Sequence, residues 1–369
     1  MAVREVPKNE HTKDGRKWIY EIRFEGKRYK SKKFLTKKEA LAAERLFYEE
    51  KEKIGNQTMM TLGDLFDDHY NYQKDKVKMT TLSNYGKKIK HFNSIKNIKL
   101  DKLTIKDIEK WKQEINSKNL ATRTKNDLMK YLKSALNYGA KWYDFNFSSM
   151  YNKMTNFTDP DEIPKEMQFY TFEGFKKFIS VEEDLRFKTL FKTLYYCGLR
   201  SGELRGLTWN DVNLESKELS VNKNITVNLD GRKYIVTTPK TKSSYRTIPM
   251  PDVLVDDLIK LREMQNNYYD FNNKWYVFGS YEPLVKSALR DRKNKDCKLA
   301  GVKQIRIHDF RHSCASLLIN NGANITMVAR YLGHAKIDET LNTYSHMFKN
   351  KLDDIVGTIN RLNNKLNNK

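Results

Sequence analysis

The sequence lacks the paired cysteines that predict disulfide bonds. Its 369 residues include only three cysteines, Cys197, Cys297 and Cys314, which are odd in number and far apart. Proteins held together by disulfides usually carry an even number of cysteines at close spacing, so this pattern fits a reducing cytosol. Cys314 is expected to be a small buried apolar group and not a nucleophile.

Membrane and metal-binding patterns are also missing. No apolar run approaches the roughly 20 residues that a membrane span requires, and no signal peptide opens the chain. Histidines gather near the C-terminus, but no pair combines four-residue spacing with an intervening Glu, and no Cys pair accompanies them. They are His308, His312, His334 and His346. We therefore expect neither a membrane protein nor a metal site.

Acidic residues are too few to balance the basic ones. The chain has 69 Lys and Arg against 46 Asp and Glu, which gives a formal net charge of +23. An imbalance of this size on a folded protein indicates a polyanionic partner, and nucleic acid is the first candidate. The length allows two or three domains, each with its own core.

Residues 1–55 are predicted to form a small separate domain. The stretch 18–24 is typical of a strand, 25–26 of a tight turn, and 27–34 of a returning strand rich in basic residues. A two- or three-stranded sheet with a basic face, backed by one helix, has the right size to lie in a DNA major groove. An edge strand that is charged only against aggregation is the alternative. The predicted DNA contacts are Arg23, Lys27, Arg28, Lys30 and Lys32.

Helices are predicted for the rest of the first half. Thr36 and Glu39 have the spacing of a capping box, which would begin a helix running to about residue 53, and residues 55–58 are predicted to be a linker. A helical domain of four or five helices then follows over residues 60–155. Its predicted N-caps are Thr61 with Asp64, Thr80 or Thr81, Thr104 with Asp107, and Thr122.

This helical domain is basic and is joined to the next part by a stretch at about residues 152–168 that we expect to be flexible. A basic bundle on a flexible connection suggests one arm of a clamp around duplex DNA. A bundle with no particular function is the alternative. The predicted DNA contacts here are Lys87, Lys88, Arg123 and Lys125.

The last part, residues 165–369, begins with helices and continues with short strands. Arg200 lies between two predicted helices at a corner that Gly198 permits, and Ser201 is the predicted N-cap of the second helix. Glu203, one turn on, can steady the Arg200 side chain.

Strands are predicted at residues 219–227, 233–237 and 245–248. Lys240 then lies at the tip of a hairpin, which is a mobile place for a proton donor.

Three predicted helices between residues 308 and 348 bring further polar residues together. His308 and Arg311 are three residues apart and share a face of the first helix. Gly333 closes the second helix and leaves His334 on the turn, and Tyr344 lies on the third. Each residue alone has an ordinary interpretation as a core Tyr, a satisfied His or a solvated Arg. Only the ordered set favours a functional site.

The motifs occur in a fixed order along the second half of the chain. They are Gly198-Leu199-Arg200-Ser201-Gly202-Glu203-Leu204 with Trp209 and Asp211, Lys240-Thr241-Lys242 before Arg246-Thr247-Ile248-Pro249, His308-Asp309-Phe310-Arg311-His312, Leu332-Gly333-His334, and Tyr344. Together they resemble the signature of the tyrosine recombinase family. Each motif alone is weak, whereas the set in this order is specific, and the likeness covers essentially the whole chain.

The resemblance implies a multidomain α+β protein. Residues 1–55, a small basic three-stranded sheet plus a helix, resemble an arm-binding domain, and residues 60–155 a helical core-binding domain. Residues 165–369 resemble a mainly helical catalytic domain with a small antiparallel sheet. The domain layout resembles the integrases of temperate phages and of integrative or conjugative elements, which implies a site-specific recombinase that integrates and excises such an element.

In that family DNA is cut and rejoined through a 3′-phosphotyrosyl intermediate without metal or cofactor. The resemblance implies that Tyr344 attacks the scissile phosphate, and that Arg200 and Arg311 bind its oxygens. His308 would accept the tyrosine proton or bond the phosphate, and His334 would donate a further hydrogen bond.

Two other residues have implied roles in the same site. Lys240 would protonate the leaving 5′ oxygen, but Lys242 lies two residues away on the same face of the hairpin, so the choice between them stays open. Glu203 would support Arg200 from behind.

The C-terminal stretch 347–366 is expected to be a polar helix with apolar residues at helical spacing. In the resembling family such a tail packs on a neighbouring protomer and links four active sites, although packing on its own domain is the alternative. The implied partners are double-stranded DNA with core-type and arm-type attachment sites, a homo-tetramer on that DNA, an excisionase and a host DNA-bending protein. The expected location is the bacterial cytoplasm, at the nucleoid.

Other classes remain open at this point. A type IB topoisomerase would use nearly the same residues but has no need of a second DNA-reading domain. A chromosome-dimer-resolving recombinase usually lacks the first domain, and a non-enzymatic DNA-binding protein would not need every catalytic position filled.

Overall fold

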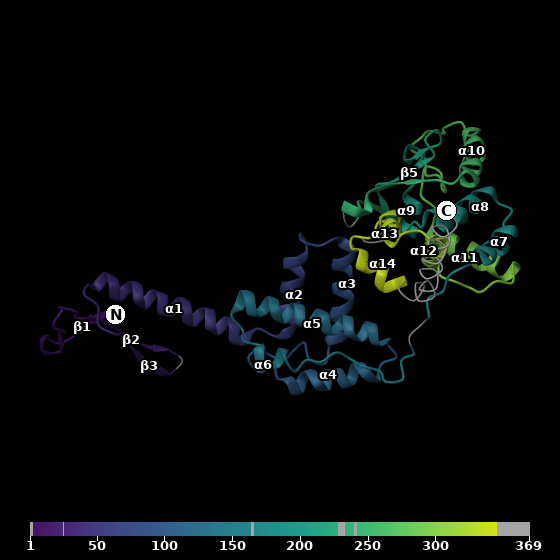
Figure 1. The fold of residues 1–369 in the computed structure, drawn as a ribbon. Helices are drawn as coiled ribbons and strands as arrows, with labels where there is room; N and C mark the ends of the chain where they lie inside the picture. Colours follow the sequence, from purple (N-terminus) through teal and green to yellow (C-terminus); the bar gives the residue numbers. More distant parts are fainter. Residues whose placement is uncertain (1–2, 25, 164–165, 228–232, 240–241, 345–369) are drawn as a thin grey trace, which may run out of the picture. The chain divides into compact units, whose positions relative to one another are not determined.

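The computed structural model describes most of the chain (Figure 1). The described residues are 3–24, 26–163, 166–227, 233–239 and 242–344. Lys240 and the predicted tail helix therefore lie outside them. In the described part, no helix is both long and apolar enough to cross a membrane.

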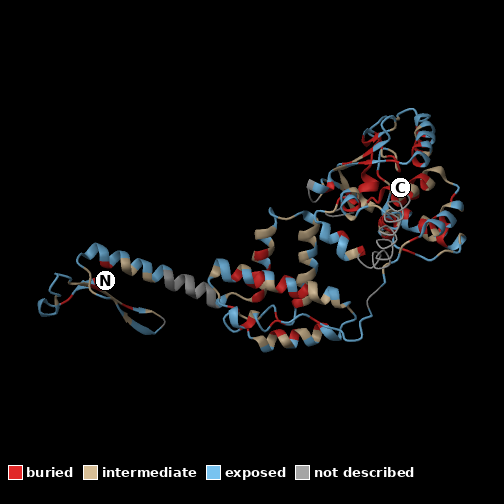
Figure 2. Cartoon of the chain, viewed as in Figure 1, coloured by how far each residue is buried: buried red, intermediate tan, exposed pale blue. Residues whose placement is uncertain are grey.

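The chain divides into two compact units, Met1–Glu162 and Ile163–Lys369, which we call the N-terminal and the C-terminal unit. Figure 2 shows buried residues gathered inside each unit. Both combine helices with small antiparallel sheets, so the expected α+β fold class is confirmed. The finer division at 1–55, 60–155 and 165–369 stays a prediction.

The N-terminal unit begins with a three-stranded antiparallel sheet and one long helix. The elements are β1 (Val3–Glu5), β2 (Trp18–Phe24), β3 (Lys27–Lys30) and α1 (Lys37–Met59), with the strands in the order β1-β2-β3. The Phe47 ring of α1 lies 5.0 to 6.3 Å from the rings of Tyr20, Phe24 and Tyr29, measured between centroids. The face that carries these three rings is thus covered by α1, whereas Glu21, Arg23, Arg28 and Lys30 lie on the other face.

Two boundaries in this region differ from the prediction. The returning strand ends at Lys30, because the Ser31 hydroxyl accepts the Tyr20 N–H at 2.9 Å and so replaces a main-chain acceptor. The predicted linker 55–58 belongs to α1, which continues to Met59. One glycine costs a helix only about 1 kcal/mol, so it does not have to end it.

A helical bundle makes up the rest of the N-terminal unit. Its helices are α2 (Leu62–Gln73), α3 (Met79–Ile89), α4 (Ile105–Ser117), α5 (Thr122–Tyr143) and α6 (Ser148–Tyr151). The Phe92 ring lies 4.8 Å from both Phe66 and Trp111 in its core. Phe157 is also buried there, and its main chain exchanges two hydrogen bonds with the Asn126 side chain. The first part of the stretch predicted to be flexible is therefore packed.

The predicted caps hold for some helices and fail for others. Thr61 with Asp64 and Thr104 with Asp107 form capping boxes at α2 and α4. The prediction was wrong for the other two helices, which the chain enters through extended residues without a side-chain cap. These are Lys78 before α3, which already includes Thr80 and Thr81, and Ala121 before α5, whose first residue is Thr122.

The C-terminal unit consists mainly of helices, with two small sheets. Its helices are α7 (Phe172–Ser180), α8 (Leu185–Cys197), α9 (Ser201–Gly206), α10 (Asp252–Asn266), α11 (Lys286–Leu299), α12 (Asp309–Asn320), α13 (Ile325–Leu332) and α14 (Ile337–Tyr344). One sheet has the order β4-β5-β8, and β6 pairs with β7 in the other. The strands are β4 (Val212–Asn213), β5 (Glu218–Val221), β6 (Asn224–Val227), β7 (Tyr234–Thr237) and β8 (Arg246–Pro249).

The single strand predicted at residues 219–227 is in fact two strands in different sheets. Between them, Asn222 and Lys223 turn aside to bind the buried carboxylate of Asp211, with Asn222 Nδ2 donating at 2.6 Å. The chain therefore leaves the first sheet at this point and enters the second at Asn224.

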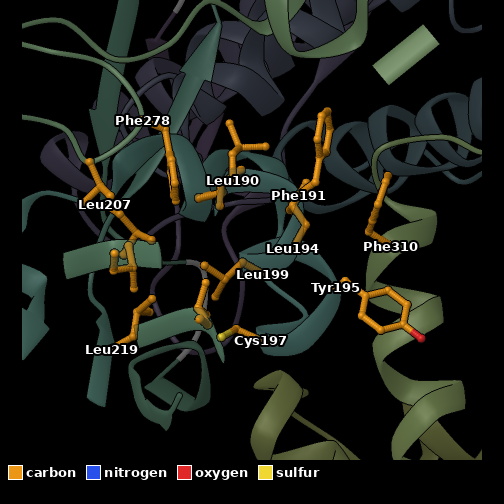
Figure 3. Packing of buried hydrophobic residues seen from close by; sticks show 14 of the residues in the cluster. Leu190, Phe191, Leu194, Tyr195, Cys197, Leu199, Leu207, Leu219, Phe278 and Phe310 are labelled. Carbon is orange, nitrogen blue, oxygen red and sulfur yellow. The ribbon is translucent and has the colours of Figure 1, made fainter. Parts of the chain in front are cut away.

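Aromatic packing anchors the start of α12 in the core of this unit. The Phe310 ring lies 5.5 Å from Phe178 and 5.7 Å from Phe191, and all three are fully buried. Figure 3 shows Phe310 and Tyr195 beside Phe191 and Leu194 of α8. Because Phe310 is held in this way, the residues on either side of it are held against the end of α8.

A buried carboxyl pair lies between α11 and the loop after α7. The side chains of Glu182 and Asp296 are almost inaccessible, and Arg292 Nε donates to Glu182 Oε2 at 2.7 Å. Burial first, and then the Glu182 carboxyl group, raise the pKa of Asp296 to about 7. Asp296 therefore keeps a proton in the folded protein at pH values where the unfolded chain has lost it.

We expect the free energy of unfolding to fall as the pH rises from about 4, where an unfolded Asp titrates, to about 7, where Asp296 titrates in the folded protein. Asp296→Asn should remove this part of the pH dependence. Urea unfolding of both proteins across that range measures it, and an unchanged slope in the variant would contradict the assignment.

The two kinds of helix start predict different responses to the same substitution. Thr104→Ala removes a capping box, and we expect the amides in the first turn of α4 to lose protection against hydrogen exchange by about fivefold. Thr122→Ala, at a helix without a side-chain cap, is the matched control and should leave the start of α5 unchanged. Equal losses at both positions would contradict this account.

Candidate active site

The site is built where the end of α8 meets the start of α12. Gly198 ends α8 with φ of +60°, and its carbonyl accepts a hydrogen bond from Arg311 Nη1 at 2.9 Å. A Cβ at this glycine would lie 2.5 Å from Leu332 Cδ2 of α13. Only glycine therefore allows α8, α12 and α13 to approach so closely.

Arg311 lies on the first turn of α12 and is only 2% exposed. Its Nη1 is used by Gly198, whereas its buried Nη2 has no hydrogen-bond partner among the described residues. Burial, and then the charge of Arg200, lower the pKa of Arg311. A buried guanidinium with an unpaired donor is costly, so the position favours an anionic ligand.

Arg200 stands at the entrance of the same site, on the corner between α8 and α9. It is the N-cap residue of α9, a position that the sequence assigned to Ser201. Glu203 holds it twice, accepting the Arg200 N–H at 3.0 Å and Nη1 at 2.8 Å. The Arg200 side chain is still about one third exposed, so it can reach a ligand.

Arg246 of β8 also belongs to the site, although the motif that contains it indicated no role for it. Its Nη2 donates to Glu203 Oε2 at 3.0 Å, and its Nε donates to the Tyr331 carbonyl, also at 3.0 Å. It thereby connects the carboxylate behind Arg200 to the end of α13, which leads into His334. The sequence feature that could have indicated this is its position two residues before the apolar Ile248. Alternate residues of a strand face the same side, so Arg246 could be expected to face inward with Ile248.

Glu203 places its carboxylate among three arginines, Arg200, Arg246 and Arg311. Burial alone would raise its pKa, but the charge and hydrogen bond of Arg246, together with Arg200, lower it below the usual Glu value. Glu203 therefore stays ionised and forms ion pairs with two of the guanidinium groups, although its single charge neutralises only one of them.

Tyr344 is buried in the same unit, and its hydroxyl lies 2.8 Å from Nδ1 of His312. Burial raises the pKa of Tyr344, and Arg311 opposes that rise. The sequence considered His308 as the acceptor of the tyrosine proton, but the residue in contact is His312, one turn further along α12. Its signal was the spacing of four from His308, which places both rings on one helix face.

The histidines of the site are held in their neutral form. Desolvation, followed by the charges of His312 and Arg311, lowers the pKa of His308, whose ring lies 5.1 Å from that of His312. Burial and Arg311 lower the pKa of His334 to about 3. The Thr340 hydroxyl lies 2.5 Å from His334 Nδ1, which orients that ring.

The structure therefore brings together most of the predicted catalytic residues in one unit: Arg200, His308, Arg311, His334 and Tyr344, with Glu203 behind them. Lys240 lies outside the described residues, and the choice between Lys240 and Lys242 stays open. Among the described residues, no group of three or more His, Cys, Asp or Glu is placed to hold a metal ion.

The predicted DNA contacts of the first sheet are divided between its faces. In the register of β2 and β3, Arg23 lies opposite Arg28 and Glu21 lies opposite Lys30. These residues are on one face of the sheet, and Phe24 and Lys27 are on the other. Arg28 also forms an ion pair with Glu21 at 2.8 Å. Three of the predicted basic residues thus share one face with a single carboxylate, while Lys27 lies on the other; Lys32 is exposed beside Phe34.

The residues of the helical bundle that were predicted to contact DNA differ in their exposure and in their hydrogen bonds within the protein. Lys87 and Lys88 lie in the last turn of α3, and Arg123 is exposed at the start of α5. Lys125 is committed to structure, because its Nζ donates to the carbonyl and the side-chain oxygen of Asn116 at 3.1 and 2.9 Å.

Chemically, the site offers two guanidinium groups for a phosphodiester, neutral imidazoles that can accept protons, and a phenol that can act as a nucleophile. Arg311 Nη2 is a buried donor without a partner among the described residues, and the charge around it is positive. Both features favour binding of an anion.

Comparisons with known proteins agree with this chemistry. The model of the phage integrase family matches residues 158–351. The ICEBs1 integrase of Bacillus subtilis (strain 168) is 30% identical over 274 residues, covering 71% of this chain and 72% of that protein.

Two solved structures share the fold. The Tn1549 transposon integrase in complex with transposon right end DNA matches with a TM-score of 0.63 and 23% identity, over 77% of this chain and 95% of that one. A lambda integrase tetramer bound to a Holliday junction matches with a TM-score of 0.56 and 17% identity, over 90% and 97%.

The buried contacts of Arg246 predict a large effect on stability. Arg246→Met leaves the Glu203 carboxylate with one partner fewer, and we expect a loss on the order of 3 kcal/mol in the free energy of unfolding. Lys217→Met breaks an ion pair whose partners are both more than half exposed, so its effect should be far smaller. Thermal unfolding of the two variants compares them directly, and similar midpoints would contradict a structural role for Arg246.

Proposed function

The chain belongs to the phage integrase family of tyrosine recombinases, and from this membership we propose that it integrates and excises a phage or an integrative or conjugative element by site-specific recombination. The observation that carries the proposal is the buried Arg311, whose Nη2 has no partner among the described residues, beside Arg200 and Tyr344. That arrangement suits the phosphate of a DNA strand and a nucleophile to attack it.

In the proposed reaction Arg200 and Arg311 hold the non-bridging oxygens of the scissile phosphate. Tyr344 Oη attacks phosphorus, a 3′-phosphotyrosyl bond forms, and the bond to the 5′ oxygen breaks. His334 and His308 donate or accept hydrogen bonds around the phosphate. Lys240, with Lys242 as the alternative, protonates the leaving 5′ oxygen.

The covalent link keeps the free energy of the broken bond. A 5′ hydroxyl from a second DNA can therefore attack the phosphotyrosine and release Tyr344 without an external energy source. This reversal turns cleavage into strand exchange and needs no cofactor.

The proposed partner is double-stranded DNA, read by three parts of the chain. Residues 1–55 would bind arm-type sites, with Arg23, Arg28 and Lys30 on the face of the sheet that α1 leaves open. Residues 60–155 would bind core-type sites next to the catalytic residues 165–369. The formal charge of +23 supports contact with a polyanion along the whole chain.

Assembly into a tetramer on DNA, through the tail beyond Tyr344, is part of the same proposal. An apolar hollow of about 670 Å³ on the C-terminal unit offers a surface for a docking helix. It is lined by Phe172, Leu317, Leu318, Asn321, Gly322 and Ala323. An excisionase and a host DNA-bending protein would control the direction of the reaction, which would take place on the nucleoid in the bacterial cytoplasm.

The central test uses DNA from an attachment site of the element, nicked near the crossover so that the 5′ fragment diffuses away. Wild-type protein should form a covalent protein–DNA complex in EDTA, and Tyr344→Phe should form none. Tyr331→Phe is the matched control, because it also removes one tyrosine hydroxyl, here a half-buried one that donates to the Tyr196 carbonyl, and it should retain the complex.

Joining of two separate DNA partners then distinguishes a recombinase from a topoisomerase. A covalent complex that persists in Tyr344→Phe would place the nucleophile elsewhere. If the wild-type protein binds this DNA but forms no covalent complex with it, the proposed enzymatic function is contradicted.

A further inference from the structure

The hydroxyl of Tyr344 has one polar neighbour among the described residues, and that neighbour is His312. The distance from Tyr344 Oη to His312 Nδ1 is 2.8 Å, and the two rings lie 5.7 Å apart at 66°. Tyr344 is 1% exposed, so bulk water does not serve its hydroxyl in this conformation.

The direction of this hydrogen bond follows from the donors and acceptors that the phenol and the imidazole carry. A phenol has one proton to donate, and a buried proton without an acceptor is costly. If His312 Nδ1 carried the proton, Tyr344 would have to donate elsewhere, and no second partner for its hydroxyl occurs in the described part. The satisfied arrangement has Tyr344 donating to an unprotonated Nδ1, with the imidazole proton on Nε2.

Burial and the charges around His312 keep its ring neutral, so that Nδ1 can accept a proton. Burial lowers the pKa of His312 most, Asp309 opposes this, and Arg306 and Arg311 lower it further. His308 faces it from the start of α12, and Glu339 is the acidic residue of α14 that acts on Tyr344. Asp309 itself is committed to Arg306, whose Nη2 donates to it at 2.8 Å.

We propose that His312 is the catalytic residue that takes the proton from Tyr344 during strand cleavage. As the bond between Tyr344 Oη and phosphorus forms and the bond between phosphorus and the 5′ oxygen breaks, the phenolic proton moves to Nδ1 of His312. The 5′ oxygen is protonated by a separate acid. In the rejoining step the imidazolium returns its proton to the departing Tyr344 oxygen.

This assignment leaves His308 free for the phosphate. His308 caps α12 beside Arg311 and on the exposed side of the site. No hydrogen bond joins its side chain to Tyr344 in the described part, whereas its ring stacks edge-on against His312 at 87°. The two histidines lie on one helix face but have different roles, because His312 accepts the proton of Tyr344 and His308 contacts the phosphate.

The proposal rests on the proposed function and is tested with the same nicked DNA and the full chain. The rate of covalent-complex formation by wild type should rise with pH and level off once His312 is neutral. His312→Ala should lose about 10²- to 10⁴-fold in rate, and its rate should keep rising with pH because hydroxide must remove the tyrosine proton. Added imidazole should restore part of the rate.

Three comparisons separate a proton acceptor from a positioning group. His312→Asn can still accept a hydrogen bond but cannot take the proton, so its rate should fall like that of His312→Ala. With a 5′-bridging phosphorothiolate, whose thiolate leaves without a proton, the defect of His312→Ala should remain. His308→Ala should be slower than wild type but keep the wild-type shape of the pH profile.

Each opposite result overturns the proposal. A near wild-type rate for His312→Asn would reduce His312 to a positioning role, and a hydroxide-dependent profile in His308→Ala would move the proton acceptor to His308. Either result, obtained while wild type still forms the complex, leaves the proposed function standing. Absence of the complex with wild type overturns both.

Discussion

The clustering of three arginines, two of them with buried side chains, around the carboxylate of Glu203 is the constraint on which the site depends. Glu203 binds Arg200 and Arg246, while the guanidinium group of Arg311 bonds to the carbonyl of Gly198 and, within the described part of the chain, to no other group. Opposite charges attract, and like charges repel, more strongly away from water. The cluster therefore holds more positive charge than the protein neutralises, and a phosphate supplies what is missing.

Burial and the same excess of charge act together on the histidines of the site. Burial lowers the pKa of His308 and His334 most, and Arg311 and other nearby charges lower it further, so these imidazoles stay neutral. A neutral imidazole can accept a proton, whereas an imidazolium can only donate one. The charge that favours phosphate binding thus adds to the effect of burial in keeping the imidazoles neutral.

Close backbone approach places these side chains. Gly333 ends α13 with φ of +72°, and a Cβ there would lie 2.9 Å from two atoms of Arg246. The turn that carries His334 can therefore rest directly on the guanidinium that also holds Glu203. At the other side, Gly198 lets α8 contact both α12 and α13. Phe310 then locks the start of α12 into the aromatic core.

Sequence reasoning succeeded where the relevant interaction is local. Thr61 and Thr104 cap helices through a residue three positions on, and the turn at Gly333 follows from the helix pattern, so both could be predicted. Lys78 and Ala121 precede helices without any capping side chain, which no local pattern indicates. The split of the strand at residues 219–227 depends on Asp211, whose ligands cannot be recognised from spacing alone.

The same difference between local and long-range interactions decides which residues of the site could be predicted. The motifs named Arg200, Glu203, His308, Arg311, His334 and Tyr344 because their order along the chain is specific. Arg246 was missed as a contact because its partner Tyr331 is 85 residues away in the sequence. His312 was seen in a motif, but its bond to Tyr344 depends on how α14 packs against α12, and periodicity says nothing about that packing.

The most direct measurement of the central claim removes one charge from the DNA instead of from the protein. A methylphosphonate at the scissile position has one negative charge less than the natural phosphodiester. If the buried excess of positive charge acts on that phosphate, wild type should cleave the methylphosphonate more slowly than the diester, and Arg311→Ala should show a much smaller difference between the two substrates. The same ratio of rates in both proteins would contradict the account.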